Sequence, residues 1–303
     1  MKRRDILKRL MVLPAVRISS GFSSKELAES KLKRFGLQLS TITANMAADF
    51  EGTLREVAAI GYQQVEFSAL GYLGREVTEV KELLAKYKLS APVGRVAFKV
   101  APDFMTMPRD QQMKVFSSQS SLDSLRDRIV GSLKECKVMD QKYLIIPAIL
   151  PHVFSDMTQI KNMLELLKES AKICRDQGVL LGYHNHNWEF DEVDGTIPFE
   201  MMLNELDPES FTFQLDTYWI RKAGRNLDQM LSQYSGRFVT CHLKDIDQAG
   251  DFEDVGHGEI NFPLFVREAI KQGAKYFFVE RDTSEEPMES IRRSFRYLEV
   301  MKY

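Results

Sequence analysis

Four apolar runs in the second half of the chain each end in a polar residue, and the spacing of these residues constrains the fold. They are His184 in LLGYHNHNWEF, Asp216 in FTFQLDTYW, His242 in RFVTCHLKD and Glu280 in KYFFVERD. Successive members lie 32, 26 and 38 residues apart. One strand, one helix and their two loops take roughly 30 residues in a (β/α)8 barrel. We therefore predict that each of these residues lies at the end of a barrel strand.

The rest of the chain follows the same alternation from Phe35 onward, with apolar runs of strand length between segments of helical periodicity. The predicted strands span residues 35–42, 62–67, 90–98, 142–149, 179–186, 211–216, 237–243 and 275–280. The predicted helices span residues 50–60, 77–87, 122–138, 157–176, 198–206, 226–235, 262–272 and 285–301. Several of these helices are followed by a glycine, which commonly ends a helix.

This pattern favours an α/β fold in which residues 34–303 form a single-domain (β/α)8 TIM barrel. The strands are mostly continuous apolar runs, as expected for parallel strands that are buried on both faces. An open doubly wound sheet is the alternative, but no Gly-x-Gly-x-x-Gly follows the first predicted strand. Residues 99–120 are polar and interrupt the alternation. We expect them to form an extended loop over the barrel mouth, either a lid or a partner contact.

Residues 1–33 precede the alternation and are treated as a leader. The segment MKRRDILK resembles a twin-arginine export signal. The apolar stretch after it, residues 10–16, is at the lower limit for a signal core, and Arg17 interrupts it. A disordered or helical basic leader is the alternative. The sequence therefore leaves open whether the protein is periplasmic or cytoplasmic.

Composition excludes several classes of function. The net charge of −2 argues against nucleic-acid backbone binding as the main role. Three scattered cysteines are too few for a disulfide framework or a cysteine-based zinc site. No apolar run approaches the ~20 residues of a membrane span. We expect a small-molecule ligand, no nucleic acid and no membrane, and we leave a homo-oligomer open.

The strand-end residues themselves suggest a chemistry. The C-terminal strand ends of a (β/α)8 barrel face the active site. Two imidazoles and two carboxylates that converge there would bind a divalent metal ion. The predicted ligands are His184, Asp216, His242 and Glu280. Such ligands suit Mn, Zn, Co or Fe better than Ca. Mg is also kept as a candidate.

Each residue also has a purely structural interpretation. His184 and His186 point to the same face of a strand and could form a hydrogen-bonded core pair. Asp216 could cap the next segment, and Glu280 could pair with Arg281. We favour function, because buried imidazoles and carboxylates are costly without partners.

Five segments resemble a known family: LGYHNHNWEF, LDTYW, CHLKD, VGHGEINF and FVERD. They are similar to the xylose isomerase-like barrels, the sugar-phosphate isomerase/epimerase group that also contains inosose dehydratases and endonuclease-IV-type enzymes. The resemblance covers residues 35–300 and implies a metal-binding TIM barrel. In the tagatose-epimerase-like branch, strands 5 to 8 end in Glu, Asp, His and Glu. Asp216, His242 and Glu280 match that pattern, whereas His184 replaces the first Glu, and Arg95 stands where relatives often have His.

The resemblance implies a metal-dependent isomerase or epimerase of a sugar or sugar derivative, with proton abstraction next to a carbonyl through a metal-stabilised enediolate. The candidates for proton transfer are Glu280, His186 and Glu66. The candidates for substrate binding are Trp188, Trp219, Lys244 and His257. Lys244 could instead neutralise Asp216 or Asp245. The alternatives are a dehydratase or lyase acting on a keto-inositol or keto-sugar, a non-catalytic sugar-binding barrel, and an AP endonuclease.

Overall fold

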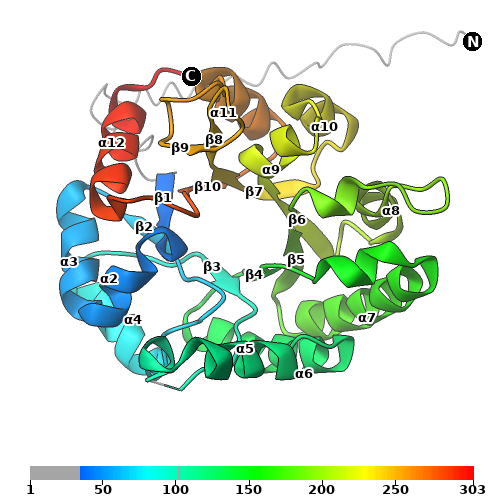
Figure 1. Ribbon diagram of the computed structural model, residues 1–303, viewed down its shortest axis with the longest axis horizontal. Coiled ribbons are helices and arrows are strands. Elements are labelled where there is room, and N and C mark those ends of the chain that lie inside the picture. The colour runs from blue at the N-terminus through cyan, green and yellow to red at the C-terminus, as the bar shows by residue number, and fades with distance from the viewer. Residues whose placement is uncertain (1–34, 102) are drawn as a thin grey trace, which may run out of the picture.

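The computed structural model describes residues 35–101 and 103–303, which form a barrel of eight parallel strands with helices around it (Figure 1). In sheet order the strands are β2 (Gln64–Glu66), β1 (Phe35–Gln38), β10 (Tyr276–Val279), β7 (Phe238–Leu243), β6 (Phe211–Asp216), β5 (Leu180–His184), β4 (Tyr143–Ile146) and β3 (Val93–Arg95). A parallel bridge between Gln64 and Ser90 joins β2 to the segment before β3, so the sheet nearly closes. The predicted TIM barrel is confirmed.

Helices connect these strands and cover the outside of the barrel. The α-helices are α2 (Thr43–Ala48), α3 (Phe50–Ile60), α4 (Val77–Lys86), α5 (Arg109–Ser118), α6 (Leu122–Val138), α7 (Met157–Asp176), α8 (Pro198–Glu205), α9 (Thr217–Lys222), α10 (Leu227–Gln233), α11 (Phe262–Lys271) and α12 (Pro287–Val300). The 3-10 helices are η1 (Leu39–Ile42), η2 (Phe104–Thr106), η3 (Pro151–Ser155) and η4 (Trp188–Phe190). Several helices begin where a side chain accepts a backbone N–H, for example at Asp49, Ser121 and Asp156.

The apolar core has two layers, one on each side of the strands. The larger layer packs outward-facing strand residues such as Leu37 and Leu215 against the helices. The smaller layer lies inside the barrel and contains Val93, Ile145 and Phe278, which are fully buried. Gly36 leaves room for Phe278, because a Cβ atom at Gly36 would lie 2.6 Å from the ring carbon Cδ1.

In the strands that carry Phe278 and Val93, the next interior position towards the C-terminal end of the strand is polar instead of apolar. Phe278 is followed by Glu280, and Val93 by Arg95, at the C-terminal end of each strand. Because alternate residues of a strand face the same side, these polar side chains lie directly above the apolar layer. The barrel interior is therefore an apolar plug with a polar layer at its C-terminal end.

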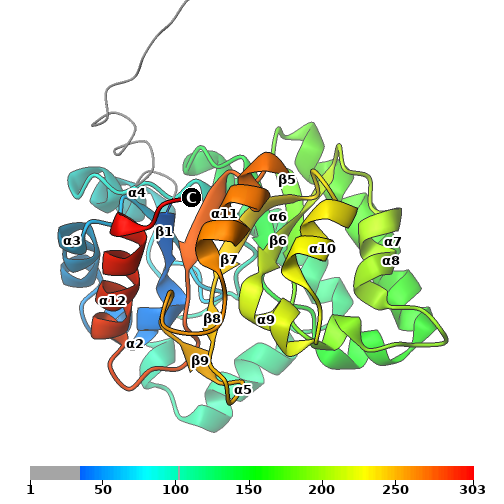
Figure 2. The same ribbon diagram turned by 90° about the horizontal axis from the view of Figure 1, so that it is seen from above.

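The prediction of an extended loop over residues 99–120 is wrong in one respect, because this segment contains η2 and α5. None of the residues of α5 is buried, so the helix lacks the apolar periodicity by which sequence reveals a helix. Helix α5 and the short hairpin of β8 (Asp245–Ile246) and β9 (Phe252–Glu253) project from the same end of the barrel, on opposite sides of it (Figure 1, Figure 2).

The predicted strand lengths are also too long in the first half of the chain. The run 35–42 divides into β1 and η1, and the run 90–98 contains only the three residues of β3. The predicted leader, residues 1–33, lies outside the described residues. Within the described residues, none of the helices has the length and apolar character needed to cross a membrane.

Candidate metal centre

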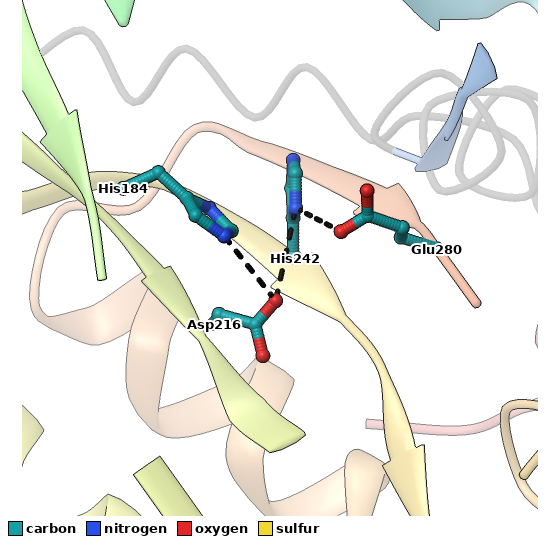
Figure 3. Close-up of side chains that lie close together, drawn as sticks. All are labelled: His184, Asp216, His242 and Glu280. Carbon is teal, nitrogen blue, oxygen red and sulfur yellow. Dashed lines mark hydrogen bonds and ion pairs between the residues drawn. The ribbon is translucent and has the colours of Figure 1, made fainter. Parts of the chain in front are cut away.

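The four predicted metal ligands converge at the C-terminal end of the barrel (Figure 3). His184 ends β5, Asp216 ends β6, His242 lies near the end of β7, and Glu280 follows β10. The strand register places Asp216 beside His242, and His242 beside Phe278. One ligand atom from each side chain lies within 4.8 Å of the others, and all four residues are buried.

The donor atoms suit a divalent cation. The Oδ2 atom of Asp216 lies 3.7 Å from Nε2 of His184 and 3.8 Å from Nδ1 of His242. The same Nδ1 lies 2.8 Å from Oε2 of Glu280. Oδ2 of Asp216 is buried and makes no hydrogen bond among the described residues, although the Lys244 ammonium lies 3.2 Å away as an ion-pair partner. A buried carboxylate oxygen usually accepts a hydrogen bond, and this one keeps that capacity unused beside two imidazoles and a second carboxylate, so the residues present fit a metal ion.

The second nitrogen of each histidine is held by a partner outside the cluster. Nδ1 of His184 lies 3.1 Å from Oε1 of Gln214, and Nε2 of His242 lies 2.6 Å from Oε2 of Glu66. With a metal ion bound, these two nitrogens would keep the protons, and Nε2 of His184 and Nδ1 of His242 would present their lone pairs to the ion. Metal-binding histidines in proteins are commonly oriented in this way.

Gln214 and Glu66 are themselves fixed by further hydrogen bonds. The amide nitrogen of Gln214 donates to Oε1 of Glu66 over 2.9 Å, and Arg95 donates to Oε1 of Gln214. Gln38 donates to Oε2 of Glu66 over 2.6 Å. Arg95 therefore supports the cluster indirectly, through the amide that holds His184.

Burial and neighbouring charges separate the two histidines electrostatically. Burial, with added repulsion from His242, holds the pKa of His184 well below its ordinary range, so this ring is neutral. Burial also disfavours charge on His242, but Glu280 and Glu66 overcome it and raise the pKa of His242 to about 9. Without a metal ion, His242 is an imidazolium between two carboxylates.

Lys244 adds a second cation beside the cluster. Its ammonium lies 2.7 Å from Oε2 of Glu280, 3.2 Å from Oδ2 of Asp216 and 2.9 Å from Oδ1 of Asp282. Burial opposes the charge, but these carboxylates raise the pKa of Lys244 above its ordinary value. Of the two carboxylates that it was expected to neutralise, Lys244 pairs with Asp216. The other, Asp245, accepts backbone N–H groups from the loop of residues 256–260.

Aromatic rings border the cluster on the side of β5 and β6. The ring of His186 stacks on Trp188, with 4.1 Å between ring centroids, and lies 5.0 Å from the ring of His184. Trp219 is 5.4 Å from His186. Nδ1 of His186 and Nε1 of Trp219 are buried without hydrogen-bond partners among the described residues. This wall therefore offers both ring faces and unsatisfied polar atoms.

The remaining predicted residues have two different environments. Glu66 is completely buried in the hydrogen-bond network under His242, rather than open to a ligand. His257 is exposed, on a loop that Asp245 holds through backbone N–H groups. The cluster of potential ligand atoms does not include His257.

Sequence reasoning missed several polar residues of the network. Gln214 precedes Asp216 by two positions and so shares its strand face, a signal that could have identified it. Ser40 donates to Oε1 of Glu280 over 2.6 Å, although the two residues are 240 positions apart. Glu189 is buried after the HNH segment and accepts hydrogen bonds from the Tyr183 hydroxyl and the His186 backbone. No sequence pattern indicates the contact of Ser40 or those of Glu189.

The raised pKa of His242 predicts a pH dependence for metal-free protein. Folding favours the protonated ring, so its contribution to stability is complete below its ordinary pKa of 6.5 and is lost as pH rises towards about 9. We expect urea unfolding of chelator-treated protein to show lower stability at about pH 9 than at about pH 6. His242→Asn should show a smaller loss over this interval. Equal pH profiles for the two proteins would contradict this assignment.

Comparison with known proteins identifies the family to which this fold belongs. The family model described as a xylose isomerase-like TIM barrel matches residues 54–301. Among curated proteins, none matches the sequence. Among solved structures, a sugar phosphate isomerase/epimerase from Parabacteroides distasonis is 21% identical with a TM-score of 0.70, covering 95% of this chain and 98% of the other.

Two further structures are similar at lower identity. D-psicose 3-epimerase with D-tagatose, from Clostridium cellulolyticum, is 14% identical with a TM-score of 0.61 and covers 88% of this chain and 99% of its own. The IOLI protein with a bound zinc atom is 14% identical with a TM-score of 0.63 and covers 89% and 99%. At such identities these structures show a shared fold. The family match spans most of the chain, and the protein therefore belongs to the xylose isomerase-like TIM barrel family.

Proposed function

We propose that this protein is a divalent-metal-dependent isomerase or epimerase of a sugar or sugar derivative, which moves a proton at a carbon next to a carbonyl. The observation that carries the proposal is the buried cluster of two imidazoles and two carboxylates at the C-terminal end of the barrel. Solved relatives with the same fold include a sugar epimerase and a zinc-containing protein.

The residues that would hold the proposed ion are His184, Asp216, His242 and Glu280, each through one nitrogen or oxygen atom. A divalent ion in such a site polarises a carbonyl and stabilises the negative charge that develops when the adjacent carbon loses a proton. Gln214 and Glu66 fix the two imidazole rings. For Glu66 we propose this positioning role rather than direct proton transfer.

Two side chains are proposed to move the proton. Neighbouring Lys244 and His242 overcome burial and hold the pKa of Glu280 well below its ordinary value, so in the metal-free protein it is an ionised but weak base. His186 has a buried Nδ1 without a hydrogen-bond partner among the described residues. The sheet order places β7 and β6 between β10 and β5, so Glu280 and His186 approach the barrel mouth from different strands.

The aromatic wall is proposed to hold the sugar. Trp188 and Trp219 offer apolar ring faces, and Nε1 of Trp219 is an unsatisfied donor for a hydroxyl. The Lys244 ammonium lies 5.6 Å from the Trp219 ring, between this wall and the cluster. His257 stays a candidate contact from the loop.

The ligand set predicts which variants lose metal. His184→Ala and Glu280→Ala should abolish tight stoichiometric metal binding, because each removes a ligand atom from a compact set. His257→Ala is the matched control and should keep its metal. Elemental analysis of the purified proteins, with a chelator competition, measures the effect. Stoichiometric metal in either of the first two variants would remove that residue from the site.

The network beneath the ligands predicts a smaller effect. Gln214→Leu removes the acceptor that orients His184, so metal affinity should fall by roughly 10–100-fold without loss of stoichiometry at saturation. Gln64→Leu is the control, because its amide oxygen has no hydrogen-bond partner among the described residues. Equal metal affinity in Gln214→Leu and wild-type protein would show that the amide does not position the ring.

The reaction type is tested with keto-sugars in deuterated water. Incorporation of deuterium into a product with the same carbon skeleton, and no loss of water, is the result expected from metal-loaded protein, whereas Asp216→Asn should give none. Loss of water would favour the dehydratase alternative on a keto-inositol or keto-sugar. Sugar binding that is independent of metal and without exchange would favour a non-catalytic barrel.

A further inference from the structure

A cavity lies beside the barrel mouth, away from the candidate metal centre. It has a volume of about 350 Å³ and lies between the loop after β2, the segment after β3 and one face of α6. Two hydrogen bonds join its walls: Phe98 N–H donates to the Ala69 carbonyl over 2.8 Å, and Ala97 N–H donates to Oγ of Ser132 over 3.1 Å. None of the four candidate metal ligands lines it.

Arg128 on α6 lines this cavity and is the unusual group in it. The residue is 6% exposed, and its Nε and Nη1 atoms are buried with no hydrogen-bond partner among the described residues. Its guanidinium stacks on Phe98, with Cζ 4.3 Å from the ring centroid. Stacking covers a face of the guanidinium but satisfies none of its N–H groups, which point outward in the plane.

The charge of Arg128 is not offset by a carboxylate in residues 35–101 and 103–303, where this residue forms no ion pair. Burial lowers its pKa to about 10. A buried guanidinium without a counter-charge is costly. Arg126, two positions away on the same helix, is half exposed and paired with Glu169. The burial of Arg128 is therefore a feature of the cavity rather than of the helix as a whole.

The other charges around the cavity limit what it can bind. Its charged lining residues are Arg75, Lys99, Arg128, Glu76 and Glu135. Three are cationic and two acidic, so the lining carries one net positive charge. Arg75 is already stacked on Phe50. A dianion would be repelled by the two glutamates, whereas a single carboxylate matches both the net charge and the planar fork of an arginine.

We propose that this cavity is a binding site for a small carboxylate, whose oxygens accept hydrogen bonds from the Arg128 guanidinium, with Lys99 at the rim. The site is separate from the proposed reaction and does not depend on it. It would give the protein a second small-molecule ligand, bound between two mouth loops and α6.

The test uses the full chain, treated with a chelator, and sodium acetate as the probe against sodium chloride at equal ionic strength. Thermal unfolding across an acetate titration gives an apparent affinity, because a ligand of the folded state raises Tm with concentration. We expect acetate to raise Tm of wild-type protein. Affinity in Arg128→Met should be at least about tenfold weaker, the loss expected for a charge-assisted hydrogen-bond pair.

Two control variants distinguish acetate binding in this cavity from acetate binding elsewhere on the protein. Arg126→Met should keep the wild-type response, and so should Asp216→Asn, whose change lies in the candidate metal centre. Arg128→Met should also be at least as stable as wild type in chloride, because it removes an uncompensated buried charge. The proposal is overturned if wild-type Tm does not respond to acetate, or if Arg128→Met responds equally. A stronger response to inorganic phosphate that depends on Arg128 would overturn the choice of carboxylate.

Discussion

The candidate centre depends on keeping several charged side chains inside the barrel by pairing them with one another. Moving a single carboxylate or ammonium group from water into a protein interior costs several kcal/mol. Here Glu66 faces Arg95 and His242, and Glu280 faces His242 and Lys244. The apolar plug beneath this layer keeps water out from below. Removing one member leaves its partner buried without compensation, so the layer acts as a unit.

The same pairing determines how this layer would respond to a metal ion. In the metal-free protein, Lys244 and protonated His242 are the cations that face Asp216 and Glu280. In the proposed function, a metal ion would compete with the proton for Nδ1 of His242, because a metal-binding nitrogen must be deprotonated. Lys244 would keep Asp282 as a carboxylate partner outside the ligand set. The segment His242-Leu243-Lys244-Asp245 therefore places a proposed metal ligand, His242, two positions before Lys244, whose ammonium lies between the cluster and the Trp219 ring.

The barrel and the convergence of four polar residues could be predicted because both follow from regular spacing. The strand ends recur at about one βα unit, and that spacing alone places His184, Asp216 and Glu280 at one end of the barrel. Helix α5 could not be found, because none of its residues is buried and a surface helix without an apolar stripe has no periodic signal. The roles of Arg95 and Ser40 could not be found either, because they arise from contacts between residues that are 119 and 240 positions apart in the sequence.

The hydrogen bonds accepted by Asp245 affect how the loop after β7 could change in evolution. The Asp245 carboxylate accepts the backbone N–H groups of Ile246, Gly256, Gly258 and Ile260, so both ends of the intervening excursion are attached to a residue that lies two positions after β7, the strand that carries His242. The excursion contains the β8–β9 hairpin, whose Phe252 lies against Trp219. Lengthening a closed loop costs little free energy. Insertions at the hairpin tip can therefore reshape the wall of the mouth while the imidazole at the end of β7 keeps its place, which separates the evolution of selectivity from that of reactivity.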